Sequence, residues 1–301
     1  EIKCCDPCWV ACGKVHRIKS AAAESLQHHA LRQLRVRDDV RVELAKQRRL
    51  EGRYRWAYRL SLRLAAGARQ KGFADLEFGA LAEVIDSGKV IGLAKSRLRE
   101  LAGRLTRLAD GSADDAVMAE ARVRRGALLR ALDEPGGAVK ALRALLSALP
   151  LRRDPQLHAY ALWNLGFAYR SLTRIKDALG YFHQALGMFA KLSDRSGVAF
   201  SLCGLAGATR LGGNSEKSLA LYRRARTLFN KERDPYGIAY ASCGVANALR
   251  KMNRFEEAVP LYRKAGELYR GMGDQVNETY VLWGKFVCLR ALGRFQEAAR
   301  A

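Results

Sequence analysis

The most constraining feature of this chain is a segment of 40 residues that recurs without insertion or deletion. Successive copies open on aspartates 40 positions apart: Asp154, Asp194, Asp234 and Asp274. Self-similarity at a fixed period of this length is typical of solenoids, in which each repeat is one small supersecondary unit stacked on the next. The register extends back to Asp114 and covers residues 114–301, well over half of the chain.

Small and large residues recur at fixed points inside each copy. In the copy that opens at Asp154 these points are Leu165, Gly166, Ala178, Phe182 and Ala185. Small residues allow two helices to approach closely, and large ones fill the space between them. Because the chain also has only six prolines and abundant Ala, Leu and Arg, helix is favoured throughout. The pattern predicts an all-α fold in which each repeat is a helical hairpin.

These residues, together with Tyr169, resemble the pattern of the tetratricopeptide repeat, TPR. That repeat usually has about 34 residues. A 40-residue version with longer helices is similar to the subclass found in Pins/LGN-type scaffolds and in the sensor domain of MalT-type regulators. The resemblance implies a right-handed α-solenoid whose first helices line a concave groove that contacts bound peptides.

The chain divides into three parts by pattern. Residues 1–37 form a cysteine-rich N-terminal segment and a helix, residues 38–113 form divergent helical hairpins, and residues 114–301 form the TPR-like solenoid. We expect Asp38 or Asp39 to cap a new helix, and the run Asp86-Ser87-Gly88 to form the turn of the second divergent hairpin. The first residue is Glu1 and not Met, which indicates a fragment or a processed product.

Cysteines cluster at the N-terminus. Cys5, Cys8 and Cys12 are spaced closely enough for their thiolates to bind zinc or an iron–sulfur cluster. The stretch is similar to the cysteine-rich tails that hold auxiliary clusters in some radical SAM enzymes, although the rest of such an enzyme is absent. The alternative is a cluster that binds no metal, or one that a partner completes.

The net charge of +23 arises from 53 Lys and Arg against 30 Asp and Glu. This balance favours acidic partners such as an acidic peptide, nucleic acid or an anionic membrane, unless it only reflects an Arg-rich composition. No run approaches the ~18 apolar residues of a membrane span. The seven cysteines are an odd number and no secretory signal is visible, so we expect reduced thiols in a cytoplasm.

No enzyme motif is present: there is no Gly-rich phosphate loop, nucleophile elbow or His-Glu metal helix, so a non-enzyme is predicted. The informative positions lie on the first helix of each repeat. We expect twelve of them to line the groove and bind a peptide: Tyr160, Trp163, Phe167, Arg170, Phe200, Arg210, Tyr240, Asn247, Arg250, Tyr280, Trp283 and Arg290.

One position in this set is an arginine in successive repeats: Arg170, Arg210, Arg250 and Arg290, preceded in register by Arg130. Packing alone does not demand a long charged residue at one place in every unit. Either these arginines hold an acidic segment, with Trp163 and Trp283 as apolar anchors, or they are a solvated face copied by duplication.

Three hypotheses remain open. The first is a protein–protein interaction scaffold that binds an acidic peptide. The second is a helical accessory domain of a larger metal or iron–sulfur enzyme. The third, non-specific nucleic-acid binding through the basic N-terminal half, depends on charge alone.

Overall fold

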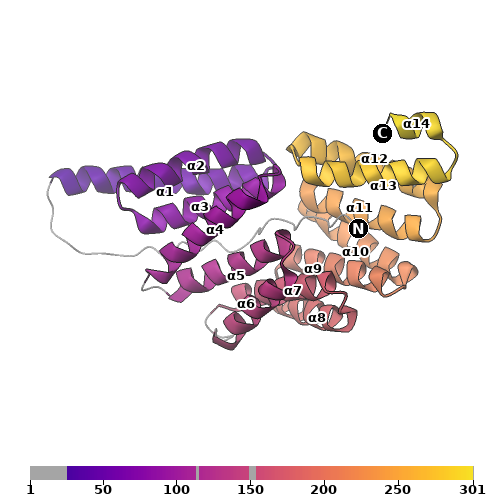
Figure 1. The fold of residues 1–301 in the computed structure, drawn as a ribbon, viewed down its shortest axis with the longest axis horizontal. Coiled ribbons are helices and arrows are strands. Elements are labelled where there is room, and N and C mark those ends of the chain that lie inside the picture. The colour runs from indigo at the N-terminus through magenta and orange to yellow at the C-terminus, as the bar shows by residue number, and fades with distance from the viewer. Residues whose placement is uncertain (1–25, 113–114, 149–153, 301) are drawn as a thin grey trace.

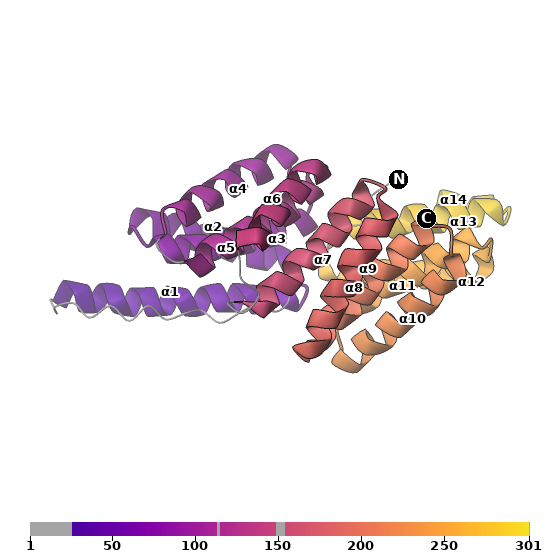
Figure 2. The ribbon, with the colours of Figure 1, turned by 90° about the horizontal axis from the view of Figure 1, so that it is seen from below.

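The computed structural model describes residues 26–112, 115–148 and 154–300, and these residues form helices and turns without a strand. Consecutive helices pack against each other along the chain, which confirms the predicted solenoid of helical hairpins (Figures 1 and 2). No described helix is both long and apolar enough to cross a bilayer. The helices are α1 (Leu26–Leu50), α2 (Tyr54–Gln70), α3 (Ala74–Val90), α4 (Lys95–Asp110), α5 (Asp115–Ala131), α6 (Pro135–Ala148), α7 (Pro155–Ser171), α8 (Ile175–Lys191), α9 (Arg195–Leu211), α10 (Ser215–Glu232), α11 (Pro235–Lys251), α12 (Phe255–Met272), α13 (Gln275–Ala291) and α14 (Phe295–Ala299).

The aspartates that open the repeats are helix caps. Each accepts a hydrogen bond from the backbone amide three residues later, at 2.7 to 3.0 Å. These amides have no partner inside their own helix, so the carboxylate replaces the missing acceptor. Pro155 and Pro235 follow two of the caps at the first helical position, where a proline loses no hydrogen bond.

Most of the described turns share one backbone device, and it sets the length of the units that contain it. A residue with positive φ stands in the turn between two helices, and from Thr173 to Gly293 such a residue recurs every 20 positions. The same interval separates the glycines that follow α1, α2 and α3, so the divergent N-terminal hairpins use the same helix-and-turn unit as the repeats. The positions are Gly52, Gly72, Gly92, Asp133, Thr173, Ser193, Gly213, Arg233, Asn253, Gly273 and Gly293.

An aromatic ring resting on glycines locks each repeat to the next. The ring of Phe182 lies between Gly166 of its own hairpin and Gly204 of the following one, where a Cβ would fall 2.6 and 2.4 Å from ring carbons. Tyr222 rests on Gly244 in the same way, with a Cβ at 2.2 Å. These approaches confirm the prediction that small residues at fixed points let the helices meet.

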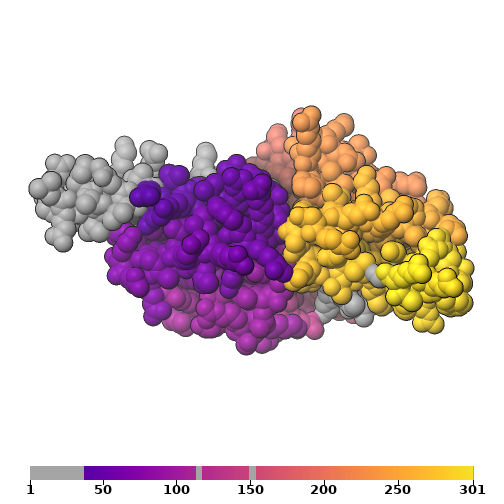
Figure 3. All heavy atoms as spheres, turned by 90° about the horizontal axis from the view of Figure 1, so that it is seen from above, coloured from indigo at the N-terminus to yellow at the C-terminus, as the bar shows by residue number. Residues whose placement is uncertain are grey.

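The solenoid curls until its two ends touch. Helix α13 packs against α3, and Figures 1 and 3 show the indigo N-terminal helices directly beside the yellow C-terminal ones. A Cβ at Gly52 would lie 2.6 Å from Cγ of Met272, so the glycine in the first turn permits this approach. Tyr54 and Val90 join the same apolar core as Met272.

Two sequence expectations in the N-terminal part are wrong. Helix α1 runs without a break through residue 38, so Asp38 and Asp39 cap no new helix and the boundary at 37/38 falls inside a helix. The run Asp86-Ser87-Gly88 is no turn, because it lies buried within α3, and the chain turns at residues 91–94 instead.

Ion pairs explain why Asp86 tolerates burial in α3. Its carboxylate lies 2.6 Å from Arg124 and 2.9 Å from Lys89. Burial by itself favours the neutral acid, but Lys89, Arg124 and Arg49 together hold the pKa of Asp86 well below its usual value. Glu83 on the same helix pairs with Arg49 at 2.6 Å. Sequence rules read Asp-Ser-Gly as a turn because they cannot see these cationic partners.

We predict that Gly244→Ala destabilises the protein by about 1–3 kcal/mol, because the new methyl group overpacks against the Tyr222 ring. The matched control is Gly187→Ala in α8, which is exposed and has no neighbouring atom within 4 Å of a new Cβ. Helix propensity makes that change stabilising by up to ~1 kcal/mol. Urea unfolding followed by circular dichroism measures both, and shifts of the same sign would contradict the interlock.

Candidate functional site

The predicted groove positions lie on the inner helices α7, α9, α11 and α13, and most of their aromatic side chains are buried. Trp163 and Phe167 are buried in α7, as are Phe200, Tyr240 and Tyr280 in the helices that follow, whereas Tyr160 is half-buried. Only Trp283 is clearly open, with 40% of its surface exposed. The expectation that Trp163 is an accessible anchor is therefore wrong.

Contacts between neighbouring repeats account for this burial. The Trp163 ring meets Phe167 edge-on at a centroid distance of 4.5 Å and meets Phe200 of the next repeat at 6.4 Å. Phe200 continues to Tyr240 at 6.4 Å. Edge-to-face and tilted pairs of this kind stabilise a core beyond their buried area. The aromatic positions therefore form the spine between repeats and not an open shelf.

Most of the arginine positions stack on aromatic rings of the inner helices. Arg130 and Arg170 approach the same Phe167 ring, with guanidinium carbons 4.9 and 4.6 Å from its centroid. Arg250 lies over Trp283 at 5.3 Å. Cation–π contacts of this kind are worth about 0.5–1 kcal/mol at exposed sites and hold the planar guanidinium in place. We call residues 130, 170, 210, 250 and 290 the arginine row; stacking orients four of them, Arg130, Arg170, Arg250 and Arg290.

Within the part of the chain that the structure describes, no carboxylate forms an ion pair with Arg170, Arg250 or Arg290. Three acidic residues of the repeats are instead paired at the turns that precede the second helices. There an arginine binds a carboxylate three residues later, in Arg174–Asp177, Arg254–Glu257 and Arg294–Glu297, at 2.6 to 2.8 Å. The inner face therefore presents cations whose charge the described fold leaves uncompensated.

Asn247 has a different role from the one expected. Its amide oxygen accepts hydrogen bonds from the Tyr262 hydroxyl at 2.8 Å and from the Tyr280 hydroxyl at 3.3 Å. Arg250 donates to the Tyr262 oxygen at 3.3 Å. Burial raises the pKa of Tyr262 well above its usual value, so the phenol stays protonated and continues to donate. Asn247 thus holds α12 and α13 together beneath the row.

On α13, sequence reasoning missed an accessible aromatic residue next to Trp283. Phe286 is 36% exposed, and Arg290 lies over its ring at 5.7 Å. It follows Trp283 by three positions, so both side chains lie on one face of α13. We call Trp283, Phe286, Arg250 and Arg290 the C-terminal patch. The three-residue spacing of Trp283 and Phe286 in the sequence could have predicted this shared face.

Cys5, Cys8 and Cys12, the predicted metal ligands, lie outside the described residues. Among the described residues, no group of three His, Cys, Asp or Glu side chains is arranged to hold a metal ion. Cys203 and Cys243 are buried, and burial raises the pKa of the Cys203 thiol far above its usual value. Such a thiol is a packing residue, since the thiolate is the reactive and metal-binding form.

We compared the sequence with protein-family models and with curated proteins. The sequence matches the family model described as tetratricopeptide repeat at residues 157–231 and again at 197–271. No curated protein matches the sequence.

Solved structures match at low identity and show the fold. The structure of a Rap protein complexed with competence and sporulation factor is 14% identical, with a TM-score of 0.66 over 88% of this chain and 74% of that one. NprR in complex with its cognate peptide NprX is 14% identical, with a TM-score of 0.57 over 87% and 75%. BtubC from P. vanneervenii is 15% identical, with a TM-score of 0.50 over 78% and 92%.

We predict that Asn247→Ala lowers the free energy of unfolding by about 1–3 kcal/mol, because two buried tyrosine hydroxyls lose their acceptor. Asn230→Ala, at an exposed position on α10, is the matched control and should change it little. Guanidinium unfolding measures both variants. Equal stability of Asn247→Ala and the parent would mean that the amide does not hold α12 and α13 together.

Proposed function

We propose that this chain, which matches the tetratricopeptide repeat model at residues 157–231 and 197–271, is a protein-interaction scaffold whose inner face binds an acidic peptide segment. The proposal involves binding without a chemical step. The observation that carries it is the C-terminal patch, in which Arg250 is stacked on the half-exposed Trp283 and has no carboxylate partner among the described residues.

The chemistry of the patch favours a carboxylate-bearing partner with some apolar surface. Guanidinium groups present a planar fork that matches a carboxylate, and stacking on Trp283 and Phe286 covers a face of the fork and not its edges. In Arg250 the Nε–H donates to Tyr262, and the two terminal nitrogens remain for a carboxylate. The chain as a whole carries +23, which attracts an acidic segment at long range. Two proteins of similar fold have peptides in their structures, competence and sporulation factor with Rap and NprX with NprR, which supports a peptide as the class of ligand.

In the proposed complex, exposed aromatic side chains contribute most of the binding free energy, and the arginines select an acidic partner. An exposed ion pair contributes only ~0.2–1 kcal/mol, which is too little to hold a peptide alone. Trp and Tyr commonly provide the strongest single contacts of an interface. Trp163 is buried in the spine, so Trp283 and Phe286 are the side chains able to provide apolar contact. We therefore centre the site on α11 and α13.

We predict that the double variant Arg250→Gln, Arg290→Gln weakens binding of a fluorescein-labelled peptide with glutamate at every third position by roughly 2- to 30-fold, the loss of two ion pairs. Fluorescence anisotropy at low salt measures the affinity. The control, Arg263→Gln with Lys264→Gln on the exposed side of α12, removes the same charge away from the inner face. Equal weakening by the control would mean that net charge alone attracts the peptide.

Nucleic-acid binding is a second candidate, favoured by one observation on α2. Arg55, Arg59 and Arg63 are exposed at successive helical turns beside Trp56, which is 44% exposed, and α2 contains no acidic residue. A basic stripe with an accessible aromatic ring suits a single strand whose bases stack. A triple Gln variant of these arginines separates the candidates: it should lose oligo(dT) binding and keep peptide binding. Unchanged oligo(dT) binding in this variant would contradict the assignment to α2.

A further inference from the structure

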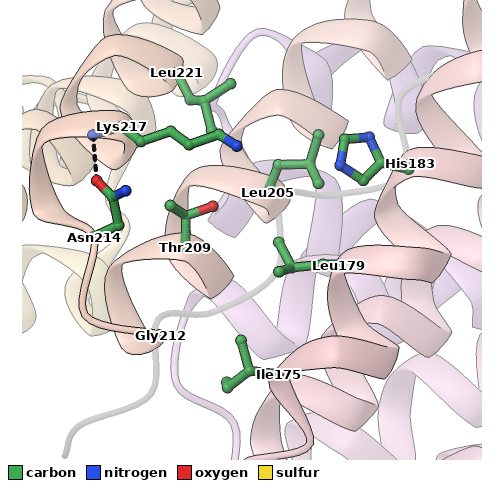
Figure 4. A pocket seen from close by; sticks show the side chains of 9 residues that line it. All are labelled: Ile175, Leu179, His183, Leu205, Thr209, Gly212, Asn214, Lys217 and Leu221. Carbon is green, nitrogen blue, oxygen red and sulfur yellow. Dashed lines mark hydrogen bonds between the residues drawn. The ribbon is translucent and has the colours of Figure 1, made fainter.

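A groove on the outer side of the solenoid breaks the repeat pattern. It lies between α8 and α10 above α9 and has a volume of about 260 Å³ (Figure 4). Its walls are aliphatic: Ile175 and Leu179 from α8, Leu205 from α9 and Leu221 from α10. Lys217 and His183 stand on opposite sides of the opening in Figure 4. The arginine row and the C-terminal patch contribute no residue to it.

Gly212, which lines the groove, stands where other repeats have a large side chain. In the 40-residue register the equivalent residues are Leu132, Leu172, Met252 and Leu292, and all four are large and apolar. A Cβ at Gly212 would lie 3.5 Å from Cγ2 of Ile175, so a longer side chain would grow toward the aliphatic wall. The backbone of Gly212 has φ −76°, a conformation open to any residue, so the glycine is not required by the turn.

The same turn also reverses a charge. In three of the other four turns of this register an arginine pairs with an acidic residue three positions later, as Arg174 does with Asp177. The remaining turn has Glu134 and Gly137 at these positions. In the turn beside the groove these two positions are Asn214 and Lys217. The Asn214 side chain caps α10 by accepting from the Lys217 backbone amide at 2.9 Å. The Lys217 ammonium therefore stands where three other repeats place a carboxylate, and no described carboxylate pairs with it.

Gly212 and Lys217 both line this groove, and together they suit a ligand with an apolar part and a negative charge. The missing side chain leaves aliphatic space, and the reversed charge puts a cation at its edge. Ligand sites are mostly apolar with a few placed polar groups, and typical volumes of about 300–1,000 Å³ make this one small. We propose that the groove binds a short-chain carboxylate, with its alkyl tail against Ile175, Leu179 and Leu221 and its carboxylate at Lys217.

Octanoate tests the proposal directly in the full chain. Titrated below its micelle concentration into protein with labelled methyl groups, it should shift the methyl signals of Ile175, Leu179 and Leu221 in a saturable way. Lys217→Glu, which restores the charge found in three other repeats, should weaken binding roughly tenfold or more by removing a charge-assisted contact. Octanol, which has the same tail without the charge, should bind more weakly than octanoate.

Gly212→Leu is the decisive variant, because it fills the groove with the residue type of the other repeats and should abolish the saturable shifts. Gly187→Leu, on an exposed face of α8 with open space around it, should keep them. Thermal melting confirms that both variants fold. Shifts that persist in Gly212→Leu, or that never saturate, would overturn the site. A leucine-containing acidic peptide that shifts these methyls where octanoate does not would also overturn it, in favour of a protein side chain.

Discussion

The contact between an aromatic ring and the glycines on either side of it supports the rest of this structure. Phe182 fills the space that Gly166 and Gly204 leave open, and Tyr222 does the same at Gly244. Because the ring of one hairpin occupies the space beside a helix of the next, adjacent repeats have one spacing and one rotation. Dense interiors transmit such constraints, since neither helix can shift without opening a void or a clash.

That fixed spacing makes the inner face a surface and not a series of independent helices. The aromatic spine formed by Trp163, Phe200 and Tyr240 binds neighbouring inner helices together. Four arginines of the row stack on other rings of the same helices, those of Phe167, Trp283 and Phe286. Repetition also makes a departure visible. Gly212 and Lys217 stand where the repeats that open at Asp154, Asp234 and Asp274 have a large apolar residue and an acidic residue, so the lining of the outer groove differs from the same positions in those repeats.

The sequence was sufficient to predict the helices of the repeats, because their caps, small residues and aromatics all follow one period. It was insufficient wherever a distant partner decides the outcome. Asp86 stays in a helix because Arg124 and Lys89 neutralise it, and no local rule contains those residues. Trp163 was expected at the surface because register places it on the inner helix, yet the next repeat covers it. The metal hypothesis at Cys5, Cys8 and Cys12, and the resemblance to the 40-residue subclass, stay predictions.

The central claim is that the inner arginines are available to an acidic partner whereas the turn arginines are already paired. Arginine side-chain Nε–Hε signals, followed by NMR during titration with a glutamate-rich peptide, test this claim directly. The account predicts shifts for Arg250 and Arg290 and little change for Arg254 and Arg294, which already bind Glu257 and Glu297. Shifts confined to the turn arginines, with Arg250 and Arg290 unmoved, would contradict it.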